Sequence, residues 1–118
     1  MSFDLPADHL ANASPAIIRD NIPPEELIRQ AENASNFLKA LSHEGRLMIL
    51  CHLTSGEKSV TELETLLGLR QAAVSQQLAR LRLEGLVSCR REGKVIRYAL
   101  SDPRAIRMMH LLHAMFCA

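Results

Sequence analysis

Apolar residues recur three or four positions apart along much of the chain after residue 23, the spacing of one face of an α-helix. The first series follows Pro23-Pro24, and proline is tolerated in the first turn of a helix. Its members are Leu27, Ala31, Ala34 and Leu38. Glu25 and Glu26 suit the positive end of the helix dipole. We therefore predict a helix over about residues 24–41, preceded by a flexible N-terminal arm over residues 1–23.

The same spacing predicts two further helices. One runs from about Glu44 to Thr54, with Ser42 as its N-terminal cap. The other runs from Pro103 to Cys117, opens at Asp102-Pro103, and is apolar on nearly all sides. Because a terminal helix of this kind needs cover on both faces, we predict a homodimer formed through the first and last helices.

The region between these helices combines two short helices with a hairpin. Ser59-Val-Thr-Glu62 has the form of a capping box, Gly68 ends that helix, and a second helix extends from Arg70 to Gly85. Two strand-like runs follow and are joined through Glu92-Gly93. They are Leu86–Arg91 and Lys94–Leu100. This order predicts a winged helix-turn-helix domain over residues 24–118, mainly α with a small β-hairpin.

Charge is distributed unevenly along this near-neutral chain, whose net charge is +1. Residues 70–97 hold seven basic and two acidic side chains, whereas residues 1–35 hold two basic and six acidic ones. A basic region that coincides with a helix-turn-helix predicts binding of double-stranded DNA. The chain shows no secretory leader and no apolar run that could cross a bilayer, so we expect a cytoplasmic protein without a membrane partner.

The helix over residues 71–84 has an apolar stripe formed by Val74, Leu78 and Leu81, so its opposite side is free to face DNA. Glutamine can pair with adenine in the major groove, and serine or arginine can bind bases or phosphates. Basic residues at the hairpin tip are expected to contact phosphate or the minor groove. The predicted DNA-binding residues are Arg70, Gln71, Ser75, Gln76, Arg80, Arg91 and Lys94.

Five runs of sequence resemble the ArsR family of winged-helix repressors, and together they cover most of the chain from about Phe37. They are Leu41-Ser-His-Glu-Gly-Arg-Leu-Met-Ile-Leu-Cys51, Ser59-Val-Thr-Glu-Leu63, Arg70-Gln-Ala-Ala-Val-Ser-Gln-Gln-Leu78, Arg82-Leu-Glu-Gly-Leu-Val87 and Arg91-Glu-Gly-Lys94. The persulfide-responsive dithiol subgroup carries one cysteine at the end of the second helix and another after a phenylalanine in the last helix. Cys51 and Phe116-Cys117 match these positions.

The resemblance implies a repressor that senses reactive sulfur species with Cys51 and Cys117. A persulfide on one cysteine is captured by the other in a polysulfide or disulfide cross-link, which releases operator DNA and derepresses sulfide-metabolism genes. Peroxide or another thiol oxidant could act on the same pair. A free cysteine alone most often packs as a small apolar residue, and Cys89 has no counterpart in the subgroup, so we take it as incidental. The sequence predicts no cofactor and no metal ligand.

Three other functions are alternatives for this sequence. His110 and His113 could form half of a zinc site, but Asp102-Pro-Arg104 does not supply the other half. An enzyme is not predicted, because the chain has no phosphate-binding loop or nucleophile motif, and Cys51 and His52 point about 100° apart on a helix. A protein-interaction module built on the same fold is also compatible with the sequence, since fold does not dictate function.

Overall fold

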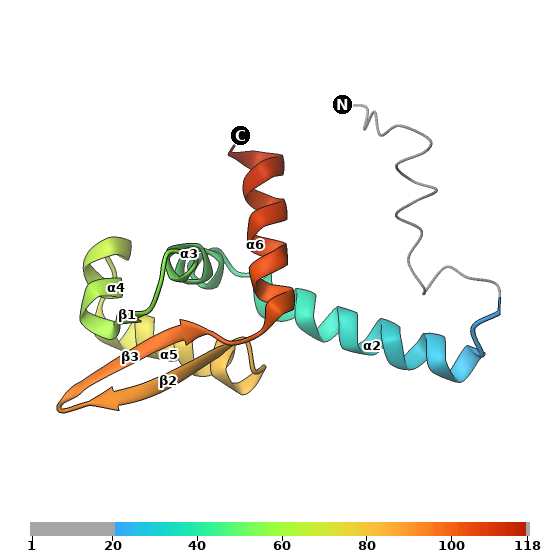
Figure 1. Ribbon diagram of the computed structural model, residues 1–118, viewed down its shortest axis with the longest axis horizontal. Helices are drawn as coiled ribbons and strands as arrows, with labels where there is room; N and C mark the ends of the chain where they lie inside the picture. The colour runs from blue at the N-terminus through green and yellow to red at the C-terminus, as the bar shows by residue number, and fades with distance from the viewer. Residues whose placement is uncertain (1–20, 118) are drawn as a thin grey trace. The chain divides into compact units, whose positions relative to one another are not determined.

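The computed structural model describes residues 21–117; most of the predicted arm therefore lies outside the described residues. The described residues belong to two compact units, one ending at Asn36 and the other beginning at Phe37. The helices are α2 Pro24–Leu41, α3 Glu44–Leu53, α4 Val60–Leu67, α5 Gln71–Leu83 and α6 Pro103–Phe116, and the strands are β1 Lys58–Ser59, β2 Val87–Glu92 and β3 Val95–Leu100 (Figure 1). This element order confirms a winged helix-turn-helix, mainly α with a small β-hairpin. None of the described helices has the length and hydropathy needed to cross a bilayer.

The second unit, from Phe37 onward, has a core of aliphatic side chains. Ile49 and Leu50 of α3, Leu63 of α4, and Leu78 and Leu81 of α5 are fully buried. The three helices contact one another. Each such side chain contributes roughly 1.5–3 kcal/mol through removal of its apolar surface from water. This core fixes α4 and α5 as a rigid helix-turn-helix on α3.

Helix ends follow from local hydrogen bonding. The predicted capping box is present: the Ser59 hydroxyl accepts from the Glu62 N–H, and the Glu62 carboxylate accepts from the Ser59 N–H, both at 3.0 Å. Gly68 closes α4 with φ 66°, in the left-handed region that glycine enters without a steric penalty. The predicted Ser42 cap is wrong. His43 is the cap of α3, because the Ser42 N–H bonds to the Lys39 carbonyl and thereby completes the end of α2.

The sheet has one strand more than the hairpin predicted from the sequence. β1 pairs antiparallel with β3, which gives the order β1-β3-β2. A two-residue strand is too short to show alternation, so no sequence pattern predicts it. Glu92 still pairs with Val95, and the turn is therefore Gly93-Lys94 rather than the predicted Glu92-Gly93. Beyond this pairing the β2–β3 hairpin extends away from the helices as a wing (Figure 1).

Replacing Ser59 with alanine removes the side-chain acceptor of the capping box. We expect the free energy of unfolding to fall by about 1 kcal/mol, the usual cost of a lost N-cap. Urea unfolding followed by circular dichroism measures this change. Thr61→Ala, in the first turn of the same helix and with an exposed side chain, is the matched control and should change stability far less. Equal losses in the two variants would contradict the capping role.

Candidate nucleic-acid interface and thiol pocket

The exposed side of α5 carries three of the seven predicted DNA-binding residues. Gln71, Ser75 and Gln76 are exposed, while Val74, Leu78 and Leu81 are buried on the opposite side. Arg70 is the N-cap residue of α5 and is exposed, and its side chain makes no capping hydrogen bond. The first turn of a helix also presents unpaired backbone N–H groups that attract phosphate. The N-terminal half of α5 can therefore present both base-reading and phosphate-binding groups.

Arg80 is placed differently from the other residues predicted on α5. It is half-buried, and its Nε lies 3.4 Å from Glu84 Oε1 one turn along the helix. It also lies close enough to Arg46 to lower the pKa of that guanidinium, after the larger effect of partial burial. The Arg80 side chain is therefore only partly exposed and lies on the flank of α5, not on its fully exposed side.

The arginines of the wing divide into two groups according to the face of the strand they occupy. Arg90 and Arg97 lie opposite each other in the register, and both are ion-paired: Arg90 with Glu57 and Glu92, and Arg97 with Glu62 at 3.3 Å. Alternation places Arg91 on the other face, opposite Ile96. Within residues 21–117, neither Arg91 nor Lys94 pairs with an acidic side chain. These two cations are the ones available to a polyanion.

The acids beside Arg90 are held ionised. A side-chain hydrogen bond from Arg90 is the main factor that lowers the pKa of both Glu57 and Glu92, and Coulomb attraction to Arg90 and Arg97 acts in the same direction. The pairs are exposed, so screening by water keeps their contribution to stability small. Their effect is local: they neutralise one face of the wing.

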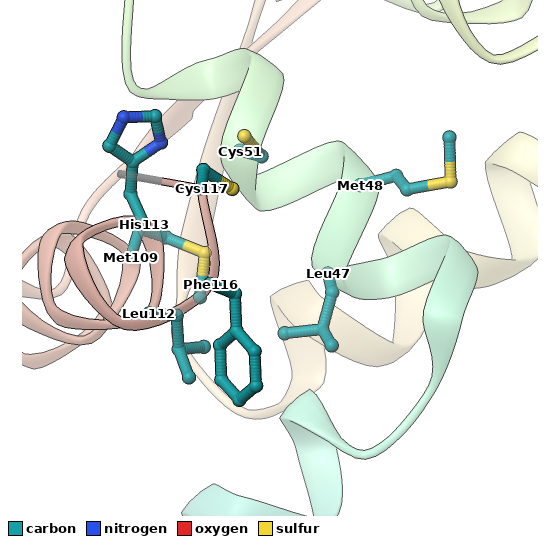
Figure 2. Close-up of a pocket in the computed structure, with 8 residues that line it drawn as sticks. All are labelled: Leu47, Met48, Cys51, Met109, Leu112, His113, Phe116 and Cys117. Carbon is teal, nitrogen blue, oxygen red and sulfur yellow. The ribbon is translucent and has the colours of Figure 1, made fainter.

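An apolar pocket of about 330 Å³ lies between α3 and α6 (Figure 2). Cys51, in the last turn of α3, and Cys117, the C-cap residue of α6, both line it. Both cysteines are free thiols and exposed to solvent. The other lining residues are Leu47, Met48, Met109, Leu112, His113 and Phe116. The two predicted redox residues, 66 positions apart in the sequence, therefore share one cavity.

The position of Cys117 depends on both ends of α6. Asp102 caps the first turn by accepting from the Arg104 N–H at 2.8 Å, and the Arg104 guanidinium lowers the pKa of this carboxyl. At the other end, the Cys117 N–H donates to the His113 carbonyl at 2.8 Å. Ala105 and Met109 are buried on the inner side of the helix. Packing of this side against α3 brings Cys117 to the pocket.

The remaining candidates do not gather into a second site. His113 lines the thiol pocket, whereas His110 is exposed outside it. In the part of the chain that the structure describes, no three histidine, cysteine or carboxylate side chains form a group able to hold a metal ion. Cys89 is half-buried on β2 opposite Tyr98, away from the pocket lining. The pocket residues Met48 and Met109 were not predicted, because helical spacing shows that a side chain faces a neighbour but not which neighbour.

Comparison with known proteins settles the family. Residues 43–88 match the protein family described as "Bacterial regulatory protein, arsR family". The biofilm growth-associated repressor of Agrobacterium fabrum is 45% identical over 97 residues, which cover 82% of this chain and 83% of the repressor. This chain belongs to the ArsR family. It is a regulatory protein and not an enzyme.

Solved structures of relatives agree with this ArsR-family assignment. Reduced HlyU of Vibrio cholerae superposes with a TM-score of 0.77 at 42% identity, covering 80% of this chain and 99% of HlyU. HlyU of that organism is named a transcriptional activator. The transcriptional repressor BigR of Xylella fastidiosa has a TM-score of 0.74, also at 42% identity, and covers 82% of this chain and 99% of BigR. The winged-helix architecture of this ArsR-family chain is thus shared along nearly the whole length of these relatives.

The wing of this ArsR-family protein offers a pH test of its ion pairs. Because Arg90 lowers the pKa of Glu57, the pair is complete above the ordinary carboxyl pKa and is lost as the pH falls through the lowered value. We expect Arg90→Met to return the Glu57 pKa toward about 4.3, measured by carboxyl NMR titration. Arg91→Met, on the other face of β2, should leave the Glu57 pKa unchanged. A Glu57 pKa that is unaltered in Arg90→Met would contradict the assigned pair.

Proposed function

We propose that this ArsR-family protein is a dimeric transcriptional repressor whose operator binding is controlled by persulfide chemistry at Cys51 and Cys117. The observation that carries the proposal is the shared pocket: two free, exposed thiols from α3 and α6 line the same apolar cavity. The relatives named as repressors, from Agrobacterium and Xylella, support repression rather than activation. The charge and exposure of α5 and the wing support DNA as the partner.

DNA contact is assigned to two sets of residues with different roles. Gln71, Ser75 and Gln76 are exposed on α5 and carry the hydrogen-bonding groups that read base edges in the major groove. Arg70, Arg80, Arg91 and Lys94 carry the positive charge that binds phosphate and positions the domain. A recognition helix flanked by a cationic wing gives one half-site for each protomer.

A second copy of the chain supplies the other half-site. α6 keeps large apolar side chains exposed although its inner side is already packed on the core. They are Ile106, Leu111, Met115 and Phe116, and their exposed fractions are 37%, 53%, 48% and 77%. Apolar surface of this extent on one helix is typical of an interface between copies. We therefore propose a homodimer through α6 together with α2.

An organic persulfide is the only reactant that the cross-link requires. One thiolate attacks the outer sulfur of an organic persulfide R–S–S–H, forms Cys–S–S–H and releases R–S⁻. The second thiolate then attacks the inner sulfur, which closes a Cys51–Cys117 disulfide and expels HS⁻. The two thiols are oxidised and the transferred sulfur is reduced to sulfide. If both cysteines first take up a sulfur, the same displacement closes a trisulfide and again releases HS⁻.

Cross-linking has a direct structural route to DNA. α3 contacts α6 on one side and α5 on the other. A covalent bridge from Cys51 to Cys117 ties α3 to the end of α6, and these helices must adjust to the length of the bridge. Because packed cores shift as units, the adjustment moves the element that carries α5 relative to the dimer helix. A small displacement is enough to misplace base contacts in two half-sites at once.

The two sets of DNA contacts predict different losses. Gln76→Ala should reduce discrimination between selected and unrelated duplexes, because it removes a group that reads bases, with a cost of roughly 1–3 kcal/mol on the selected duplex only. Lys94→Ala should weaken binding to both duplexes and reduce the dependence of log K on log salt by about one phosphate contact. Fluorescence anisotropy with a duplex selected from a random library measures both effects. Unchanged affinity in both variants would contradict the surface.

The dithiol predicts a matched series of cysteine variants. Cys51→Ser and Cys117→Ser should each bind DNA like the wild type but remain bound after an organic persulfide is added, because neither can close the cross-link. Cys89→Ser is the matched control and should still be released. Anisotropy and intact mass are read on the same samples. Release of DNA from either of the first two variants would contradict a two-cysteine switch.

A further inference from the structure

A polar junction outside the thiol pocket joins three helices of the second unit. Its centre is the half-buried guanidinium of Arg46, in the first turn of α3. Arg46 Nε donates to the Ala40 carbonyl at 2.6 Å, and Nη2 donates to the Lys39 carbonyl at 3.2 Å, both in the last turn of α2. Nη1 donates to Gln77 Oε1 of α5 at 3.0 Å. One side chain thus connects the end of α2, the start of α3 and the helix that carries Gln76.

This junction holds α5 in place through contacts to one flank of the helix. Gln77 is half-buried beside the apolar stripe, whereas its neighbour Gln76 is exposed. The amide nitrogen of Gln77 lies 3.4 Å from Nε2 of His43, and Nδ1 of the same ring accepts the capping hydrogen bond from the Gly45 N–H. The Gln77 amide therefore lies between Arg46 and the cap of α3. The apolar stripe decides which side of α5 faces outward, and such directional contacts then set the exact rotation of the helix.

We propose that Arg46 is a positioning residue that sets the rotation of α5 through Gln77, and so aligns Gln76 with the bases. The inference rests on the proposed DNA-reading role of α5. Hydrogen bonds to base edges require placement within about 0.5 Å, and a small rotation of α5 exceeds that tolerance at its exposed face. The planar fork of arginine suits this task, because it holds three acceptors in fixed directions. A lysine at the same position keeps the charge but loses the fork.

The rival role for Arg46 is a phosphate contact, and the geometry opposes it. Each of its three nitrogens already donates to a protein acceptor, and the side chain is half-buried. A phosphate ligand and a positioning residue also differ in salt dependence. Removing a phosphate contact lowers the slope of log K against log salt by about 1, whereas misaligned base contacts lower the affinity for the selected duplex and leave the slope unchanged.

The test uses the full chain and a duplex that the wild type selects from a random library, with a scrambled duplex of equal length. Arg46→Lys, Gln77→Met and the double variant are compared by anisotropy across a salt series, and thermal unfolding checks that each is folded. We expect Arg46→Lys and Gln77→Met each to weaken binding of the selected duplex about tenfold. The scrambled duplex should be bound as by the wild type, and the double variant should be no weaker than either single one.

Arg29→Lys is the matched control, because among residues 21–117 its guanidinium pairs with Glu26 of its own helix, and it should bind both duplexes like the wild type. Wild-type affinity in Gln77→Met, or in a folded Arg46→Lys, would overturn the positioning role while leaving the proposed repressor intact. Arg46→Met, which removes the charge, is measured in the same salt series. A lower salt slope in this variant would also overturn the positioning role, in favour of a phosphate contact. If the wild type selects no duplex, both proposals fail.

Discussion

The structure depends on the burial of one stripe of α5. Val74, Leu78 and Leu81 have no exposed surface, and α3, α4 and β2 all contact the helix that carries them. This single apolar contact decides which side of α5 faces outward and leaves its polar residues in solvent. It also places α5 against α3, whose far end carries Cys51. The proposed DNA-reading surface and the thiol pocket therefore depend on the same packed core.

Ion pairs further limit which of the exposed surfaces can bind DNA. The basic region seen in the sequence is not uniformly available to DNA, because Arg90 and Arg97 are neutralised by Glu57, Glu62 and Glu92 on one face of the wing. Single exposed pairs add little to stability, typically below about 1 kcal/mol. Their effect is on which surface stays cationic: within residues 21–117, the wing cations without an acidic partner are Arg91, on the other face, and Lys94, at the tip. A near-neutral protein can thus present a local cationic edge.

Much of the fold could be predicted from the sequence because its signals are local. The apolar periodicity predicts the helices to within a few residues, and the structure confirms the Ser59–Glu62 capping box and the Asp102-Pro103 helix start. The missed features depend on contacts between distant segments. β1 is defined only by its pairing with β3. The cap of α3 is His43 rather than the predicted Ser42, because the Ser42 N–H donates to a carbonyl of α2.

The candidate site also combines features that the sequence predicts with features that only the packing of distant segments creates. Periodicity indicated the exposed line of α5, and resemblance to relatives pointed to Cys51 and Cys117. The pocket that contains both thiols follows from the packing of α6 on α3, and the three acceptors of Arg46 come from two other helices. The spacing of residues within one helix cannot predict such a junction, because the three partners lie 6, 7 and 31 positions from Arg46.

In the proposed mechanism, closing a sulfur bridge between α3 and α6 releases DNA. The most direct measurement titrates an organic persulfide into the reduced protein on its selected duplex, and reads bound fraction and intact mass at every step. We expect the released fraction to equal the fraction of protomers in which Cys51 and Cys117 are linked by a disulfide or trisulfide, and a reductant to restore binding. Release without that link, or a linked protein that still binds, would contradict the proposed switch.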